Sequence, residues 1–236
     1  MFYNKDVVNI RDSLIHSNTK VSVNINEIFV ATIVKGIKEG SKILDIGTGN
    51  GYVLNEIRKV TNDDKGLYGI DNSKYMVEEA IKNGLSNIFV SDNYSIPFED
   101  GFFDIVTAKN VTRFSAEEIF RVLKPNGVFV YREYGIYKGL VEISKLFKNR
   151  LIRSRDCSYY VEKLSKAGFS SFEIKKYLIE KEYDSIESVI NVVSSFPYVE
   201  GLDENDKDLI RDYLKSNGLV IKSDPFILVG GKYEDY

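Results

Sequence analysis

Residues 43–52 read Ile43-Leu44-Asp45-Ile46-Gly47-Thr48-Gly49-Asn50-Gly51-Tyr52, and most of the chain's organisation follows from this run. Its first four residues are apolar apart from Asp45, which is typical of a strand buried on both faces. The three alternating glycines let the backbone turn sharply and approach a ligand without a Cβ in the way. Apolar side chains then recur at helical spacing over Tyr52–Val60. The run therefore predicts a strand, a glycine turn and a helix whose positive N-terminal end faces the turn.

The same alternation continues on both sides of this run. The predicted strands are Lys42–Ile46, Gly66–Ile70, Asn87–Val90, Phe103–Thr107 and Val128–Tyr134. The predicted helices are Glu27–Ile37, Tyr52–Val60, Ser73–Asn83 and a helix from Ser115 to Leu123, where Ser115 and Glu118 have capping-box spacing. Strands separated by segments of helix length predict an α/β fold with a largely parallel, doubly wound sheet and helices on both faces.

The pattern after Gly135 is less regular. Helices are expected over Lys138–Phe147 and Asp156–Ala167, and strands over Ser171–Leu178 and Phe226–Val229. The long segment between those two strands is expected to be a helical insertion, with helices near Ser185–Ser194 and Asn205–Ser216. We therefore expect a single domain over residues 1–236, with an N-terminal helical cap segment (1–40), a ligand-binding core (41–135) and an insertion on the substrate side (183–218).

Composition and charge exclude several classes of protein. The 32 Lys and Arg residues nearly balance the 35 Asp and Glu residues, which disfavours a protein that mainly holds a nucleic-acid backbone. Apolar runs are too short to span a bilayer, and the N-terminus lacks the apolar core of a signal peptide. Cys157 and His16 are the only residues of their types, so an intramolecular disulfide is impossible and a Cys/His zinc site has too few ligands. We expect a cytoplasmic protein without membrane partners or a metal.

The spacing of the glycines limits which class of ligand the turn can bind. Dinucleotide enzymes favour G-x-G-x-x-G, whereas here the glycines follow G-x-G-x-G, and no Lys-Ser/Thr follows as a P-loop would require. Asp71 ends the second predicted strand, where a doubly wound sheet places a carboxylate beside the turn, able to accept both hydroxyls of a ribose. A tight turn without a ligand, and an acid that only precedes a helix, are the alternatives.

Four motifs in order resemble the class I S-adenosylmethionine (SAM)-dependent methyltransferases, over about residues 40–135. Asp45–Gly51 is similar to the first motif of this family and Asp71 to its acidic second. Ser91–Val106 resembles the stretch that reaches adenine and leads through Pro97-Phe98 into the fourth strand. Leu123–Val128 resembles the Leu-Lys-Pro-Gly-Gly turn before the fifth, with Asn126 in place of one glycine, and Asn tolerates a left-handed backbone. The resemblance implies a seven-stranded Rossmann-like sheet.

The resemblance also implies a site for SAM and for its product S-adenosylhomocysteine. The glycine turn would wrap the methionine moiety, Asp45 would orient the turn and meet the amino group, and Asp71 would hold the ribose. Asp92 and the backbone of Asn93 would face the adenine. The implied cofactor-binding residues are Asp45, Gly47, Thr48, Gly49, Gly51, Asp71, Asn72, Met76, Asp92, Asn93, Asn110 and Val111.

The acceptor is harder to predict. In-line methyl transfer needs a positioned nucleophile, and a base only when the acceptor is protonated. In the family that the chain resembles, members acting on planar amides and exocyclic amines carry Asn/Asp-Pro-Pro-Tyr after the fourth strand. Here that place reads Lys109-Asn110-Val111-Thr112. We therefore expect a small-molecule acceptor methylated at oxygen, nitrogen or carbon. The catalytic residue stays open, with Glu133, Tyr134, Arg113 and His16 as weak candidates.

Three rival functions remain at this point. A methyltransferase with an RNA or protein acceptor keeps the cofactor site but changes the partner. An NAD(P)-dependent oxidoreductase would use the same strand, turn and helix, although the glycine spacing disfavours it. A SAM-binding protein without turnover would carry the same motifs, because methyl transfer can leave no base to find. The oligomeric state is not predicted.

Overall fold

The computed structural model of this chain describes residues 20–62, 64–195 and 198–233. His16 therefore lies outside the described residues. The described chain divides into two compact units. The core unit holds residues 25–133, 157–175 and 226–233, and the accessory unit holds residues 20–24, 134–156 and 176–225. This division concerns compactness alone, so the expected single domain with its cap, core and insertion boundaries stays a prediction.

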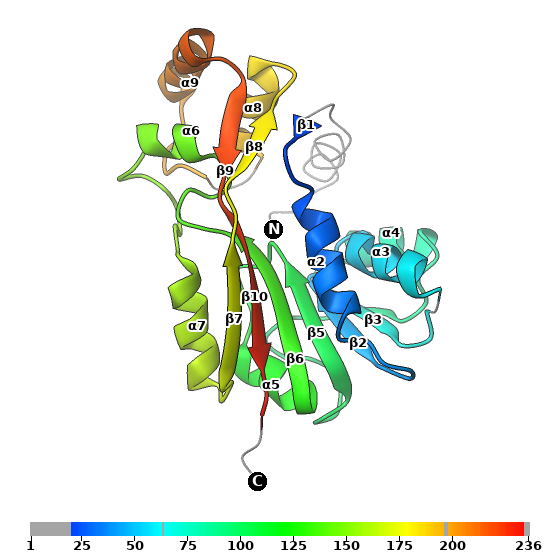
Figure 1. The fold of residues 1–236 in the computed structure, drawn as a ribbon. Helices are drawn as coiled ribbons and strands as arrows, with labels where there is room; N and C mark the ends of the chain where they lie inside the picture. Colours follow the sequence, from blue (N-terminus) through cyan, green and yellow to red (C-terminus); the bar gives the residue numbers. More distant parts are fainter. Residues whose placement is uncertain (1–19, 63, 196–197, 234–236) are drawn as a thin grey trace. The chain divides into compact units, whose positions relative to one another are not determined.

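The core unit is built on a sheet of seven strands in the order β4-β3-β2-β5-β6-β10-β7 (Figure 1). β2 pairs in parallel with β3 and with β5, β3 with β4, and β5 with β6. The strands are β2 (Ile43–Ile46), β3 (Leu67–Asp71), β4 (Ile88–Val90), β5 (Phe103–Lys109), β6 (Leu123–Tyr134), β7 (Ser171–Lys176) and β10 (Pro225–Gly231). The predicted doubly wound, mostly parallel sheet is confirmed.

The strand at the chain's end runs against its neighbours. Lys232 exchanges backbone hydrogen bonds of 2.8 and 2.9 Å with Asn126 and Gly127 at the start of β6, so β10 is antiparallel to β6. The arrows of β10 and β7 also point in opposite directions in Figure 1. Asn126 has φ 63°, the left-handed conformation that made Asn an acceptable replacement for glycine. The strand is continuous from Leu123, where a turn followed by a strand from Val128 was expected.

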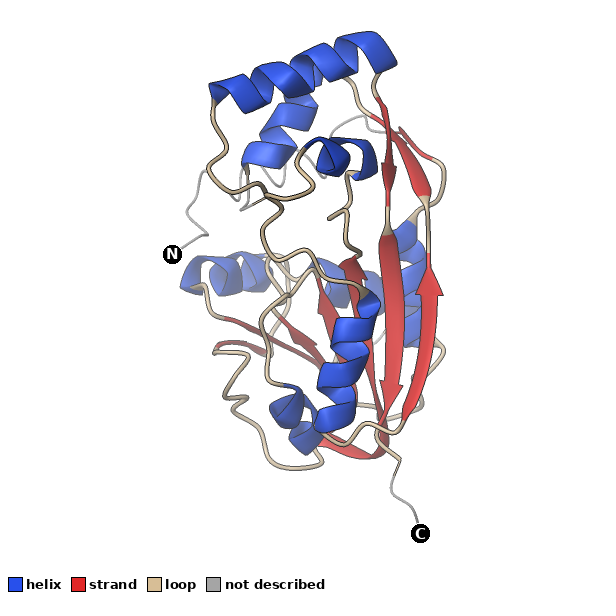
Figure 2. Cartoon of the chain, turned by 90° about the vertical axis from the view of Figure 1, so that its left-hand side faces the viewer, coloured by secondary structure: helices blue, strands red, loops and turns tan. Residues whose placement is uncertain are grey.

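Helices cover both faces of the sheet (Figures 1 and 2). Side chains of α5 (Ala116–Val122) and α7 (Cys157–Lys166) share one buried cluster with the sheet face that carries Leu44 and Phe129. The opposite face meets α3, because a Cβ at Gly69 would lie 3.1 Å from Leu54 Cδ1. The helices on that face are α2 (Ile25–Val34), α3 (Tyr52–Thr61) and α4 (Lys74–Lys82).

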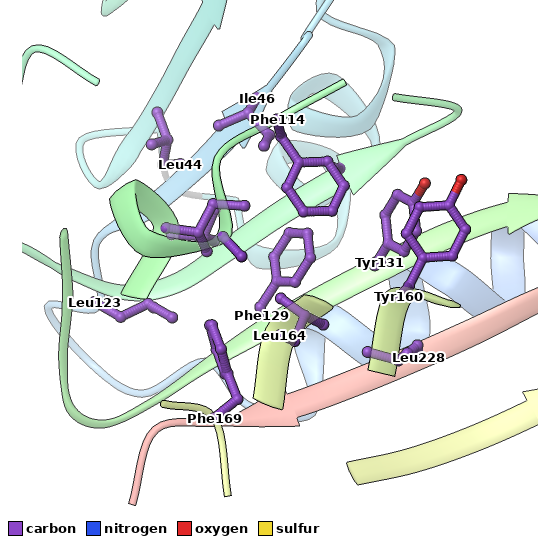
Figure 3. Close-up of a cluster of buried hydrophobic side chains, with 14 of the residues drawn as sticks. Leu44, Ile46, Phe114, Leu123, Phe129, Tyr131, Tyr160, Leu164, Phe169 and Leu228 are labelled. Atoms are coloured by element: carbon purple, nitrogen blue, oxygen red, sulfur yellow. The ribbon is translucent and has the colours of Figure 1, made fainter. Parts of the chain in front are cut away.

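Aromatic side chains dominate the cluster between the sheet, α5 and α7 (Figure 3). Phe114 and Phe129 are fully buried with ring centroids 5.6 Å apart, and Phe169 and Leu228 belong to the same cluster. Each such side chain contributes about 1.5–3 kcal/mol of burial free energy. This packing fixes β5 and β6, the two strands whose ends carry the predicted substrate-side residues.

The accessory unit has its own sheet and core. β1 (Lys20–Val21), β8 (Ile179–Glu182) and β9 (Val220–Ser223) form an antiparallel sheet in the order β1-β8-β9. α6 (Val141–Leu146), α8 (Ile186–Ser194) and α9 (Glu204–Asn217) supply a buried cluster that includes Ile190, Ile210 and Tyr198. Both helices predicted for the insertion are present, whereas β8 and β9 were not predicted. No helix in the described ranges is long and apolar enough to cross a membrane.

Candidate cofactor-binding site

The glycine turn after β2 has the left-handed backbone that its sequence requires. Gly47, Gly49 and Gly51 have φ values of 63°, 57° and 81°. A Cβ at Gly47 would lie 2.5 Å from Val111 Cγ2, and one at Gly51 would lie 2.3 Å from Leu85 Cδ1. A Cβ at Gly49 would meet no atom of residues 20–62, 64–195 or 198–233 within 4 Å. The turn is therefore packed at its two ends and open in its middle, where a ligand can approach the backbone.

Asp71, the last residue of β3, lies beside this turn as predicted. Its Oδ2 accepts a hydrogen bond of 2.9 Å from the backbone N–H of Gly49, and its Oδ1 accepts one of 2.9 Å from Ser73. Burial raises the pKa of Asp71, while these two backbone N–H groups oppose the shift. Each oxygen keeps a further lone pair, so both can still accept from the hydroxyls of a ribose.

Asp45 is a buried carboxylate with an unused acceptor. The residue is 2% exposed, and its Oδ1 has no hydrogen-bond partner among the residues that the structure describes. Burial raises the pKa of Asp45 to about 7, and the Thr48 side chain and the charge of Lys109 oppose the shift. Because buried polar atoms are normally paired, this carboxylate fits a site that a charged donor completes.

The segment after β4 joins this edge of the sheet. Ser91 N–H donates to the backbone oxygen of Asp71 at 3.0 Å, which ties the two strand ends together. Asp92 is exposed and its Oδ1 accepts from Tyr94 N–H at 3.0 Å. Asn93 Nδ2 donates to the carbonyl oxygen of Arg113 at 3.3 Å. Of the other implied residues, Asn72 is exposed and Met76 is half-buried at the start of α4.

Asn110 and Val111 follow β5 and close the other side of the turn. Asn110 has φ 57°, and its Oδ1 accepts from the guanidinium of Arg132. The Val111 side chain is the group that excludes a Cβ at Gly47. Its carbonyl oxygen lies 3.0 Å from the hydroxyl of Tyr131, a residue on the neighbouring strand β6. Val111 thus connects the glycine turn to β6.

The four catalytic candidates are placed differently. Glu133, near the end of β6, is buried, and its Oε2 lies 3.4 Å from the Tyr131 hydroxyl. The Arg113 side chain is exposed, although its backbone meets Asn93. Tyr134 is half-buried and belongs to the accessory unit, and His16 is not among the described residues.

Sequence reasoning missed two tyrosines, Tyr131, whose hydroxyl lies 3.4 Å from Glu133 Oε2, and Tyr160, whose ring contacts that of Tyr131. The rings of Tyr131 and Tyr160 lie 4.9 Å apart, and Figure 3 shows their hydroxyls pointing the same way, out of the apolar cluster. Burial raises the pKa of Tyr131 well above its ordinary value, and the charge of Glu133 adds to the effect. The signal for Tyr131 was a tyrosine in the middle of the predicted strand Val128–Tyr134, because a buried tyrosine hydroxyl needs a polar partner.

Comparisons with known proteins agree with this geometry. A family described as "Methyltransferase domain" matches residues 44–131. The sterol 24-C-methyltransferase erg6 of Schizosaccharomyces pombe is 34% identical over 140 residues, which cover 54% of this chain and 35% of that protein. The ubiquinone/menaquinone biosynthesis C-methyltransferase UbiE of Geotalea daltonii is 33% identical over 178 residues, 68% of this chain and 72% of that protein. The chain thus spans about a third of the length of the sterol enzyme that it matches.

Solved structures show the same fold. The YcgJ protein of Bacillus subtilis superposes with a TM-score of 0.64 at 19% identity, covering 89% of this chain and all of that one.

The residues around the glycine turn also fit SAM. Within the described part of the chain, the turn is open at Gly49 and the buried Asp45 Oδ1 lacks a partner such as an amino group would supply. Asp71 borders the same opening through its bond to Gly49. Carboxylates around the opening suit a ligand that carries a sulfonium and an ammonium group.

Proposed function

Because this chain belongs to the class I SAM-dependent methyltransferases, we propose that it transfers the methyl group of SAM to a carbon atom of a small, largely apolar acceptor. The hydrogen bond between Asp71 and Gly49 is the observation that carries the cofactor part, since it joins the ribose-side acid to the turn. The acceptor part is supported by two relatives, one named as a sterol 24-C-methyltransferase and the other as a C-methyltransferase of ubiquinone/menaquinone biosynthesis. The cytoplasmic setting expected from the sequence stays a prediction.

The cofactor would be held along the carboxyl edge of the sheet, as is usual in open α/β folds. In this proposal Asp71 accepts from the ribose hydroxyls, Asp45 from the amino group and Asp92 from the adenine. Asn110 and Val111 hold the methionine end against the turn. When bound, SAM supplies an electrophilic methyl group on a positively charged sulfur. The protein's contribution is then to hold the acceptor carbon in line with that methyl group, worth up to about 7–11 kcal/mol of the barrier.

The cluster of Tyr131, Tyr160 and Glu133 is our candidate for the acceptor side. Methyl transfer to an unsaturated carbon forms a C–C bond while the electron pair of the C–S bond stays on sulfur. The acceptor is left with a positive charge and must lose a proton. Glu133 is a buried carboxylate that follows Tyr131 by two positions in the chain. It lies near the end of β6, at the edge of the sheet where ligands of such folds bind. We propose that this carboxylate takes the proton and that the two tyrosine hydroxyls fix its position.

A transfer experiment tests the function. The purified chain is incubated with methyl-labelled SAM and, separately, with an apolar lipid extract, a polar metabolite extract, total RNA and total protein. We expect label in the lipid fraction, in a product whose mass spectrum shows the methyl group on carbon. An Asp71→Ala variant serves as the control without a working cofactor site. Label found only in RNA or protein would overturn the acceptor proposal, and SAM binding without transfer to any pool would favour a non-catalytic binding protein.

A further inference from the structure

Lys109 lies where the end of β5 meets the helix behind the glycine turn. Its ammonium is 4.3 Å from the centroid of the Tyr52 ring. Tyr52 is the first residue of α3 and directly follows Gly51. Asn110, which directly follows Lys109, has a left-handed backbone and leads into Val111, whose side chain packs on Gly47. The Lys109 side chain is therefore fixed beside the turn by the face of an aromatic ring.

The register of the sheet puts Lys109 on the same face as Asp45. Asp45 is the Cα partner of Thr107, and Lys109 lies two residues beyond Thr107 on the same strand. Side chains two apart on a strand point to the same face. Burial raises the pKa of Asp45, and the positive charge of Lys109 opposes that rise. The ammonium and this carboxylate thus form a pair of opposite charges at one end of the open turn.

That pair matches one end of the cofactor. The methionine part of SAM carries an ammonium and a carboxylate on the same carbon atom. Asp45 suits the ammonium, whereas the acids of the site repel the carboxylate, which needs a cation of its own. Arg132, the cross-strand partner of Lys109, is a second cation on this face, but its guanidinium donates to Asn110 Oδ1 and is buried. Lys109 is half-buried, so its charge is screened less than that of a surface lysine.

We propose that Lys109, held on the Tyr52 ring, binds the carboxylate of the methionine part of SAM. The inference rests on the proposed function for the identity of the cofactor and adds a specificity residue to it. A purely structural Lys109, which only covers Tyr52, makes a different prediction. In that case its replacement weakens all adenosyl ligands alike, through the fold and not through one group of the ligand.

Ligands with and without the carboxylate separate these two roles. Isothermal titration calorimetry is run with SAM and with decarboxylated SAM, which keeps the sulfonium and the amine but lacks the carboxylate. The proteins are the natural chain, Lys109→Met and Lys59→Met. Lys59 is an exposed lysine at the far end of α3 that pairs with Glu56, so its replacement removes one positive charge outside the site.

We expect Lys109→Met to weaken SAM binding by at least about tenfold, or about 1.4 kcal/mol, and to leave the binding of decarboxylated SAM within about twofold. Lys109→Arg should retain most of the affinity for SAM, and Lys59→Met should match the natural chain with both ligands. Tyr52→Leu, which removes the supporting ring, should show a smaller loss with the same selectivity. The melting temperature of each ligand-free variant shows whether the fold is kept.

An equal loss for both ligands, or no loss for SAM, overturns the role of Lys109. These results leave the cofactor assignment in place, because the natural chain still binds SAM. Failure of the natural chain to bind either compound overturns the cofactor assignment and the Lys109 proposal together. The two failures are therefore told apart by the natural chain alone.

Discussion

At the scale of single residues, the implied cofactor site holds three carboxyl groups in unequal surroundings. Asp45 is buried with an unused oxygen, Asp71 is half-buried and accepts two backbone N–H groups, and Asp92 is exposed. All three were predicted from their motifs, because an acid at a strand end is visible in the sequence. Their differences in burial were not, because burial is set by neighbours on other strands, such as Thr107 and Gly69 beside Asp45.

Asp45 should make the ligand-free protein sensitive to pH. Its pKa is raised to about 7 in the folded state from about 3.8, so the folded state holds a proton that the unfolded state has lost between these values. The free energy of unfolding should therefore fall as pH rises from about 4 to 7, by an amount on the order of a few kcal/mol at most. Calorimetric melting of the natural chain and of Asp45→Asn between pH 5 and 8 measures the difference. Parallel pH dependences of the two proteins would contradict this expectation.

Asp71→Ala should weaken SAM binding by at least about tenfold, or about 1.4 kcal/mol. The substitution removes the acceptor for the ribose hydroxyls and the acceptor for Gly49 N–H together. Titration with SAM at a fixed pH measures the effect. Asp100→Ala is a control, because Asp100 is an exposed acid whose ion pair with Arg121 lies outside the site. Unchanged affinity in a folded Asp71→Ala variant would show that the carboxylate is misassigned.

At the scale of elements, local signals predicted the core well. Ser73 and Ser115 begin α4 and α5, and their side chains accept from Met76 N–H and Glu118 N–H. The capping box expected for α5 is only half formed, because the Glu118 carboxylate accepts from Ile96 N–H and pairs with Arg121 instead. This long-range competition is invisible in a local pattern.

The strands β8 and β9 show the limit of sequence reasoning more clearly. β8 reads Ile-Glu-Lys-Glu and β9 reads Val-Ile-Lys-Ser, and each has four residues. Their charged side chains favour a helix or a loop when taken alone, since strand preference depends on cross-strand neighbours. The pairing of Glu182 with Val220 joins segments on either side of two helices. Only the folded accessory unit supplies that neighbour.

The glycine turn should separate stability from binding. Gly51→Ala places a Cβ 2.3 Å from Leu85 Cδ1 at a positive φ, so it should lower the melting temperature strongly. Gly49→Ala meets no protein atom within 4 Å, so its cost to folding should be the backbone strain of about 1–2 kcal/mol. That new methyl group, however, occupies the space of the ligand, and SAM affinity should fall by more than the strain explains. Thermal melting and calorimetric titration of both variants test the contrast. The expectation would be contradicted if the loss of SAM affinity stood in the same proportion to the loss of stability in both variants.

At the scale of the whole molecule, the chain carries two separate buried clusters, one in each unit. The core unit holds every described residue of the implied cofactor site. The accessory unit holds Tyr134, and its own buried cluster contains the hydroxyl group of Tyr198. There the Tyr198 hydroxyl lies 3.2 Å from the carbonyl oxygens of Tyr137 and Leu140 and contacts Ser144.

Tyr198→Phe should therefore affect stability without affecting cofactor binding. The change removes a hydrogen-bond donor, while Tyr137 O still accepts from Leu140 N–H and Leu140 O from Ser144 N–H, so it should cost about 0.5–1.5 kcal/mol. Denaturant unfolding should show that loss, while the affinity for S-adenosylhomocysteine should stay within about twofold of the natural chain. Tyr233→Phe, an exposed position, is the matched control. A large loss of affinity in Tyr198→Phe would show that the accessory core influences the cofactor site.

The hydrogen bond from Gly49 N–H to Asp71 has one more consequence. A single carboxyl group holds the glycine turn, and in the proposed function the same group accepts from the sugar of the nucleoside. On this proposal the two halves of the ligand are recognised jointly and not by independent contacts. A sugar-free compound such as S-methylmethionine would never touch Asp71, and yet its retention would still depend on that side chain.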